Sequence, residues 1–245
     1  MKVSVFTPSI RIEGLKLVQK ALKRQTYKNF EWIVCSPKVP EVDCIWLKDT
    51  HKGGYWTLNR AYNDLIEKAQ GDLIISWQDY TFADPDCLEK FVAHFEAEPK
   101  TLVSAVGNKY TQIEPYPMLK VWQDPRESER YGSYYKCVYN DVEWNLSSIP
   151  KSALYDIGGF DERLDFEGFG MDGFAVNDRI NSLGTYDFKI DQSIKSYSLP
   201  HDRHEDWDKF NLINGGWILR KQKLIDKGVY PKLNYLNLSE KEGLA

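Results

Sequence analysis

The chain lacks several features that would assign it to a specialised class of protein. It contains no run of about twenty apolar residues and no recognisable signal peptide. Its four cysteines form no Cys-x-x-Cys pair, which argues against a zinc knuckle. The net charge is −4 and no long basic run occurs, so tight duplex binding driven by phosphate contacts is disfavoured. We therefore expect a soluble protein without a membrane span, in the reducing cytoplasm.

The composition is that of an ordinary globular protein. Apolar residues make up 42% of the 245 residues and charged residues 28%, which suits a sizeable core under a solvated surface. Aromatic residues reach 14%. Such rings can stack on sugars or bases, although most serve core packing. The length suits one large domain or two fused halves, and no internal repeat or low-complexity linker is present.

Strand-like and helix-like patterns alternate through the first hundred residues. Leu15, Val18 and Leu22 share one face of a helical pattern whose other face carries lysines and an arginine. The alternation predicts βαβ units, and hence an α/β fold with a mainly parallel sheet flanked by helices. The expected strands are 3–7, 29–35, 44–48 and 73–77, and the expected helices are 12–25, 56–69 and 86–98.

This rhythm changes after Pro99. Residues 107–142 are irregular, aromatic and rich in proline and charge. A long loop of this kind inside a compact domain is often functional, so we expect a lid or an acceptor wall there. The remaining expected strands are 102–106, 144–149 and 186–199, and the remaining helices are 151–157, 172–183 and 210–226.

The segment 71–80 is the most informative part of the chain. Its apolar run from Leu73 to Trp77 is typical of a strand buried on both faces, and Asp79 follows directly. In open α/β sheets, ligands bind at the carboxyl ends of such strands. A carboxylate there can hold a divalent metal and, through it, a diphosphate. The alternative interpretation is a strand-end cap or a solvated turn carboxylate.

Several segments occur in an order that points to one family. They are residues 3–9 with their Pro-Ser turn, 25–34 (QTYKNFEWIV), 60–63 (RAYN), 69–74 (AQGDLI), 157–162 (IGGFDE), 169–172 (FGMD) and 178–184 (DRINSLG). Over roughly residues 1–205 this order resembles the family-two glycosyltransferases of the GT-A fold. The last two segments resemble the C-terminal motif of galactosyltransferase-like enzymes. The resemblance implies transfer of a sugar from a nucleotide-diphospho-sugar, with a UDP-sugar as the first expectation, to an acceptor hydroxyl.

The chain departs from the family pattern at its chemical positions. Gln78-Asp79-Tyr80 stands where the metal-binding DxD triplet is expected, so only the middle acid remains. In the acidic pair that supplies the base of inverting members, Asp172 keeps the first place and Gly173 takes the second. The resemblance implies Mn²⁺ or Mg²⁺ at Asp79, completed by His201.

The resemblance also implies roles for individual side chains. Asp172 is the candidate base of an inverting transfer, although it also stands where a helix N-cap is expected. Glu167 could contact the acceptor or replace the missing acid, whereas Asp165 is interpreted as surface charge. Asn63 could instead brace a helix–strand junction. The expected donor pocket consists of Thr7, Pro8, Ser9, Arg11, Ser36, Asn59, Asn63, Gln78 and Asp79.

Residues 1–100 are expected to form the nucleotide-sugar-binding half and residues 101–205 the acceptor and catalytic half of the same GT-A domain. Residues 206–245 are expected to form a C-terminal helical extension. The acceptor could be a glycan, a small molecule, a protein or a modified DNA base. Two other functions stay open: a GT-A domain that binds without catalysis, and a phage-type DNA hydroxymethyl-base glycosyltransferase. The latter would use the basic residues 220–232 as a local patch.

Overall fold

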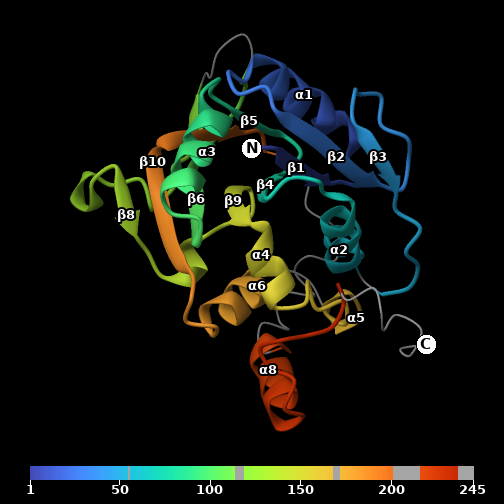
Figure 1. Cartoon of the computed structure of the whole chain (residues 1–245). Coiled ribbons are helices and arrows are strands. Elements are labelled where there is room, and N and C mark those ends of the chain that lie inside the picture. Colours follow the sequence, from blue (N-terminus) through green and yellow to red (C-terminus); the bar gives the residue numbers. More distant parts are fainter. Residues whose placement is uncertain (55, 114–118, 168–171, 201–215, 237–245) are drawn as a thin grey trace.

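The computed structural model describes residues 1–54, 56–113, 119–167, 172–200 and 216–236 (Figure 1). A single sheet runs through it in the order β3-β2-β1-β4-β9-β6-β10-β5, with β7 paired to β6 and β8 paired to β10. Helices pack on the faces of this sheet (Figure 1). The predicted α/β fold with a mainly parallel sheet is therefore confirmed. Among the described residues, no helix has both the length and the apolar character needed to cross a membrane.

The strands of the first half are parallel to one another. They are β1 (Val3–Pro8), β2 (Phe30–Ser36), β3 (Ile45–Lys48) and β4 (Leu73–Trp77). Side chains alternate between the two faces: Leu73 and Ile75 enter one core and Ile74 enters the other. Because both faces are covered, the strand reads as a continuous apolar run, as the sequence predicts.

The second half extends the same sheet. β6 (Thr101–Tyr110) and β10 (Asp187–Ser198) are parallel to each other, and β9 (Leu146–Pro150) lies antiparallel between β4 and β6. The antiparallel direction of β9 was not anticipated. Three short strands were also missed: β5 (Thr81–Ala83), β7 (Lys120–Trp122) and β8 (Tyr134–Lys136). The region 107–142 is therefore less irregular than its composition indicates, because pairing with β6 and β10 supplies hydrogen bonds that no local pattern encodes.

Two hydrophobic cores flank the sheet. One packs α1 (Leu15–Arg24) and α3 (Cys87–Ala97) against the sheet. The other packs α2 (Leu58–Lys68), α4 (Lys151–Asp156) and α6 (Asp172–Asn181) on the opposite face. Leu15, Val18 and Leu22 are buried, as predicted from their spacing. The first turn of that predicted helix is instead a 3₁₀ helix, η1 (Ile12–Gly14). Two further 3₁₀ turns, η2 (Glu129–Tyr131) and η3 (Tyr139–Asp141), lie in the 107–142 region.

The C-terminal extension docks on the turn after α4 that contains Gly158 and Gly159, which we call the glycine turn. α8 (Gly216–Asp226) contributes Trp217 and Leu224 to a small cluster beside α5 (Leu164–Glu167). The chain then follows the turn, since Leu233 N–H donates to Ile157 O and Tyr235 N–H to Gly158 O, both at 2.9 Å. The first part of the predicted helix 210–226 lies outside the described residues.

Candidate functional site

One edge of the sheet collects most of the predicted donor residues. β1, β2, β4 and β6 point their carboxyl ends to this edge, and the antiparallel β9 begins there. We call it the site edge and define it by residues 8–11, 36–38, 78–80 and 143–145. The backbone N–H of Gln78 donates to Asn145 O at 3.0 Å, which joins the end of β4 to the start of β9. The edge is thus built from both halves of the chain.

Asp79 lies at the centre of the site edge and is almost fully buried. Ser9 Oγ donates to its Oδ2 at 2.6 Å. Arg11 donates to both oxygens, from Nε to Oδ2 at 3.1 Å and from Nη2 to Oδ1 at 2.6 Å. Asp79 has 2% of its side chain exposed and Arg11 34%, so the ion pair has a buried anion and a solvent-facing cation. The structure therefore brings together Ser9, Arg11 and Asp79, three of the residues of the predicted donor pocket.

The backbone turns sharply directly after Asp79. Tyr80 has φ of 56°, in the left-handed region that non-glycine residues rarely adopt. Its ring packs against Gly14 so closely that a Cβ at Gly14 would lie 2.5 Å from Tyr80 Cδ2. The guanidinium of Arg11 lies 5.7 Å from the centroid of the same ring. This turn fixes the direction of Asp79 toward Arg11, and a glycine at position 14 makes it possible.

Thr7 and Ser36 also lie at the ends of β1 and β2, but their hydroxyl groups are used in hydrogen bonds to other residues of the chain. Thr7 Oγ1 donates to Trp77 O at 2.7 Å and accepts from Trp32 Nε1 at 3.0 Å. Ser36 Oγ donates to Lys38 O at 2.8 Å and accepts from Trp46 Nε1 at 3.1 Å. Both residues are fully buried, whereas Pro8 is only partly buried. Thr7 and Ser36 therefore shape the edge through the backbone.

Asn59 and Asn63 sit on α2, and their contacts are with the segment 160–165. Asn63 Nδ2 donates to Phe160 O at 3.1 Å and to Glu162 Oε1 at 2.8 Å, and its Oδ1 accepts from Phe160 N–H at 2.8 Å. Asn63 therefore braces a junction through direct hydrogen bonds. The junction joins α2 to the glycine turn and not a helix to a strand. The buried Oδ1 of Asn59 has no hydrogen-bond partner among the described residues.

Asp165 corrects an expectation drawn from the sequence. The interpretation of Asp165 as surface charge is wrong, because the residue is fully buried. Its Oδ1 accepts from Asn59 N–H at 3.0 Å and Asn59 Nδ2 at 2.8 Å, and its Oδ2 accepts from Arg60 N–H at 3.1 Å and Arg60 Nε at 2.9 Å. Asp165 is thereby the cap of α2, where the local N-cap residue Thr57 makes no capping bond. No local pattern signals this role, because cap and helix are far apart in sequence.

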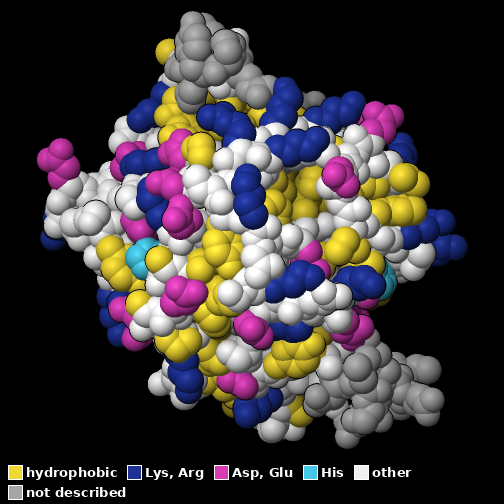
Figure 2. Space-filling model, turned by 45° about the horizontal axis from the view of Figure 1, so that its top comes forward, with side chains coloured by type: hydrophobic (Ala, Val, Ile, Leu, Met, Phe, Trp, Pro, Cys, Tyr) yellow, Lys and Arg dark blue, Asp and Glu magenta, His cyan; other side chains and the backbone are white. Residues whose placement is uncertain are grey.

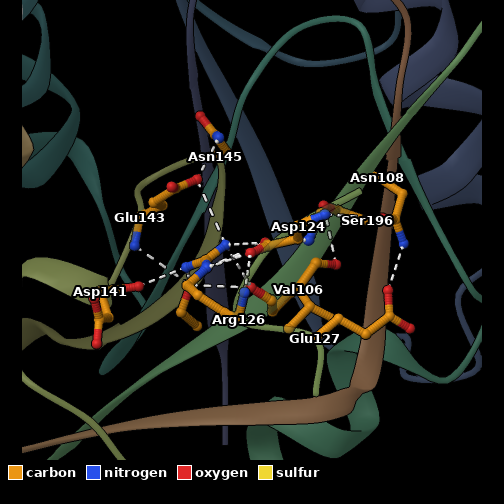
Figure 3. A network of polar contacts seen from close by, with 12 residues as sticks. Val106, Asn108, Asp124, Arg126, Glu127, Asp141, Glu143, Asn145 and Ser196 are labelled. Atoms are coloured by element: carbon orange, nitrogen blue, oxygen red, sulfur yellow. Dashed lines mark hydrogen bonds and ion pairs between the residues drawn. The ribbon is translucent and has the colours of Figure 1, made fainter. Parts of the chain in front are cut away.

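Sequence reasoning missed a polar network beside β9 (Figure 3). Asp124 is 1% exposed and pairs with Arg126, whose Nε lies 2.9 Å and 3.1 Å from the two carboxylate oxygens. Asp124 also accepts from Gly107 N–H at 2.8 Å. These bonds and the charge of Arg126 hold the pKa of Asp124 below its usual value, although burial acts in the opposite direction. The network ties the 107–142 region to the end of β6.

Glu143 extends this network onto the site edge. Its Oε2 accepts from Asn145 Nδ2 at 3.0 Å and lies 3.5 Å from Arg126 Nη2. Burial raises the pKa of Glu143, and the charges of Asp124 and Asp141 raise it further, while Arg126 and Lys109 act in the opposite direction. The side chain is nevertheless 46% exposed. A signal was present in the sequence, since Glu143 directly precedes an expected strand.

The remaining predicted residues fall at the limits of the described structure. Glu167 is the last residue of α5 and Asp172 the first of α6, but the positions of their side chains lie outside what the structure describes. His201 also lies outside the described residues. β10 ends at Ser198 on the site edge, and Leu199 N–H donates to Tyr80 O at 3.1 Å.

A divalent metal does not fit the residues that the structure describes. Among them, no group of three acidic, histidine or cysteine side chains is placed to hold a metal ion. Asp79 accepts three hydrogen bonds from Ser9 and Arg11, which uses most of the roughly four lone-pair sites of a carboxylate. A metal at Asp79 would compete with the guanidinium of Arg11 for the same carboxylate. The structure thus places a side-chain cation where the resemblance predicts a metal ion.

The basic segment 220–232 is partly committed to ion pairs. Arg220 Nε lies 2.9 Å from Asp161 Oδ2, and Lys221 Nζ lies 2.9 Å from Asp178 Oδ2. Lys227 and Lys232 line a pocket of about 620 Å³ between α8 and the glycine turn. On the face shown in Figure 2, basic and acidic side chains are interspersed. These observations add no support to the alternative of a DNA-binding patch.

Comparison with known proteins shows likeness at the level of structure. No protein-family model matches the sequence, and no curated protein matches it. GalNAc-T7, solved with UDP, GalNAc and Mn²⁺, superimposes with a TM-score of 0.63 at 13% identity over 84% of this chain and 45% of that one. TarS 1–349 of S. aureus, solved with UDP-GlcNAc, gives 0.59 at 12% identity over 89% of this chain and 67% of TarS.

TarS 1–349 solved without that ligand gives a TM-score of 0.56 at 13% identity, over 81% of this chain and 60% of that one. This chain spans less than half the length of the GalNAc-T7 chain that it matches. At these identities the likeness concerns the fold. The chain has the GT-A glycosyltransferase fold.

Proposed function

We propose that the protein is a glycosyltransferase that moves a sugar from a nucleotide-diphospho-sugar to an acceptor hydroxyl. The observation that carries the proposal is the Arg11–Asp79 pair at the carboxyl ends of β1 and β4. Ligands bind at this edge of open α/β sheets. The GT-A fold adds support, as do the neighbours solved with UDP and with UDP-GlcNAc, which make a UDP-sugar the first candidate donor.

Arg11 is the proposed counter-charge for the donor diphosphate. Departure of a nucleoside diphosphate develops negative charge, which a fixed cation stabilises. The guanidinium of Arg11 is held by the buried carboxylate of Asp79 and still reaches solvent. An arginine presents its donors in a fixed planar fork that matches phosphate oxygens. Asp79 would then act by positioning Arg11.

The alternative for the diphosphate is Mn²⁺ or Mg²⁺ at Asp79 and His201, as the resemblance implies. GalNAc-T7 was solved with Mn²⁺. In this chain a metal and Arg11 would compete for one carboxylate. Since the described residues favour Arg11, we propose that donor binding does not need a metal.

The acceptor side is formed by the second half of the chain. An inverting transfer requires that the acceptor hydroxyl lose its proton. Asp172, at the start of α6, is the candidate base that the resemblance supplies, and Glu167, at the end of α5, is the second acid of that segment. The class of acceptor is left open among a glycan, a small molecule, a protein and a modified DNA base.

Calorimetric titration with UDP, GDP and dTDP, and with their common sugars, tests this proposal. A uridine nucleotide should bind, and Arg11→Ala should weaken its binding. Lys23→Ala is the matched control, because Lys23 is an exposed cation at the far end of α1. If no nucleoside diphosphate or nucleotide sugar binds, with or without Mn²⁺, the proposed function is wrong. The alternative of a GT-A domain that binds without catalysis then takes its place.

A further inference from the structure

Three acids at or beside the site edge, Asp79, Asp124 and Glu143, differ in how many of their carboxylate oxygens the protein itself contacts. Asp79 and Asp124 are buried, and arginines contact both of their carboxylate oxygens. Glu143 differs, because its two side-chain contacts, with Asn145 and Arg126, both go to Oε2. The described residues give its Oε1 no partner, and nearly half of the side chain is exposed. Glu143 therefore presents a carboxylate oxygen that a ligand can reach.

The position of Glu143 relative to the donor site follows from the strand pairing. Trp77 is paired with Leu146, and Gln78 N–H donates to Asn145 O. Asp79 is one residue beyond this bond and Glu143 is two residues beyond it. Strand spacing and the rise per residue then place the two Cα atoms within about 15 Å of each other. A hexose ring that reacts between a diphosphate at Arg11 and an acceptor hydroxyl fits within this separation.

The backbone of Glu143 is fixed independently of any ligand. Its N–H donates to Ser104 Oγ at 3.4 Å on β6, and its carbonyl accepts from the hydroxyl of Ser147 on β9. Asn145 Nδ2 holds one carboxylate oxygen (Figure 3). A base must be oriented before the reaction, and these contacts supply that orientation from two strands.

The charges around Glu143 suit a proton acceptor. The groups that face it are Arg126, Asp124 and Asp141 from the 107–142 region and Lys109 from β6. Arg126 is already neutralised by Asp124. The negative charge of Glu143 is therefore only weakly compensated by nearby cations, which agrees with the upward direction of its pKa. A carboxylate with a raised pKa is a stronger base at neutral pH than an ordinary one.

We infer that Glu143 is the group that accepts the proton of the acceptor hydroxyl. The hydroxyl oxygen forms a bond to the anomeric carbon of the donor sugar while the bond from that carbon to the diphosphate oxygen breaks. The electron pair of the broken bond leaves with the nucleoside diphosphate, and the proton passes to Oε1 of Glu143. This inference rests on the proposed function, and it assigns the base to Glu143, three residues before β9, instead of to Asp172.

Hydrolysis of UDP-GlcNAc and UDP-GalNAc by the full chain tests the inference, because water then replaces the acceptor and loses its proton to the same base. Glu143→Gln should reduce hydrolysis about 100-fold to 10,000-fold, the range typical of losing a general base. Its UDP affinity and melting temperature should stay those of the wild type. Glu129→Gln, an exposed change on η2, is the matched control. Asp172→Asn is compared in the same assay.

Wild-type hydrolysis in Glu143→Gln combined with loss in Asp172→Asn overturns the inference. A second measurement does not require turnover of a nucleotide sugar. In protein labelled with ¹³C at glutamate carboxyls and saturated with UDP, the signal lost in Glu143→Gln should titrate above the ordinary glutamate pKa. Titration at or below that value also overturns the inference. Failure of the proposed function looks different, since the wild type would then bind no UDP.

Discussion

Arg11 donates to both carboxylate oxygens of Asp79, at 2.6 Å to Oδ1 and 3.1 Å to Oδ2. The two residues follow neighbouring parallel strands, β1 and β4, so their approach is a consequence of strand order. A guanidinium that binds a buried carboxylate in this way has a fixed orientation. The pair therefore offers a preformed cation at the edge where a donor diphosphate is expected.

Nucleotide binding should depend on Arg11 and not on a divalent metal. Arg11→Ala should lower the affinity for UDP about 10-fold to 100-fold, because a charged hydrogen-bonding group contributes about 1.5–3 kcal/mol. Arg11→Lys should recover only part of the loss, since lysine lacks the planar fork. Calorimetry in EDTA should give the same affinity as calorimetry in Mn²⁺. UDP binding that disappears in EDTA and returns with Mn²⁺ would show that a metal displaces Arg11.

Loss of Asp165 should destabilise the fold strongly. Asp165→Ala removes the acceptor of four hydrogen bonds and leaves the largely buried Arg60 without its carboxylate. Breaking a buried ion pair on one side costs about 3–5 kcal/mol. Urea denaturation measures the change in the free energy of unfolding. Asp187→Ala is the comparison, because Asp187 forms an exposed pair with Lys136 and should lose at most about 1 kcal/mol. Equal losses in both variants would contradict the capping role.

Acid should destabilise the protein partly through Asp124. The folded-state pKa of Asp124 lies below the ordinary value of an aspartate, so its contribution is present at neutral pH and is lost as the pH falls through the folded pKa. Thermal denaturation between pH 7 and pH 2 should show that Asp124→Asn is less stable than the wild type at neutral pH. The difference should shrink below about pH 4. A difference that stays constant across this range would mean that the carboxylate charge of Asp124 contributes nothing.

Gly158 should tolerate no side chain. Its φ is 69°, and a Cβ there would lie 1.5 Å from Leu233 O. Gly184 has a φ of 67° and nothing within 4 Å of a Cβ. A substitution there therefore measures the cost of backbone strain without a steric clash. Gly184→Ala should cost about 1–2 kcal/mol. Gly158→Ala should cost clearly more and should speed proteolytic cleavage of residues 229–236. Similar losses at both positions would mean that the extension does not depend on this contact.

Local patterns were sufficient for much of the fold. The continuous apolar run of β4 and the helical spacing of Leu15, Val18 and Leu22 are visible in the sequence, because each is a pattern among residues that are neighbours in the chain. The short strands β5, β7 and β8 were not predictable in this way. Three residues are too few to carry a period, and each strand depends on a partner elsewhere in the chain.

The apolar run 73–77 is enough to predict that Asp79 follows a buried strand, at the edge where open α/β sheets bind their ligands. The residues that contact Asp79 are visible only in the folded chain. Arg11 is 68 residues away, and Asp165 caps a helix whose first residues are 106 positions earlier. The open carboxylate of Glu143 likewise depends on Arg126 being neutralised by Asp124. Periodicity is a property of neighbours in the chain, whereas charge compensation and burial depend on which distant segments pack together.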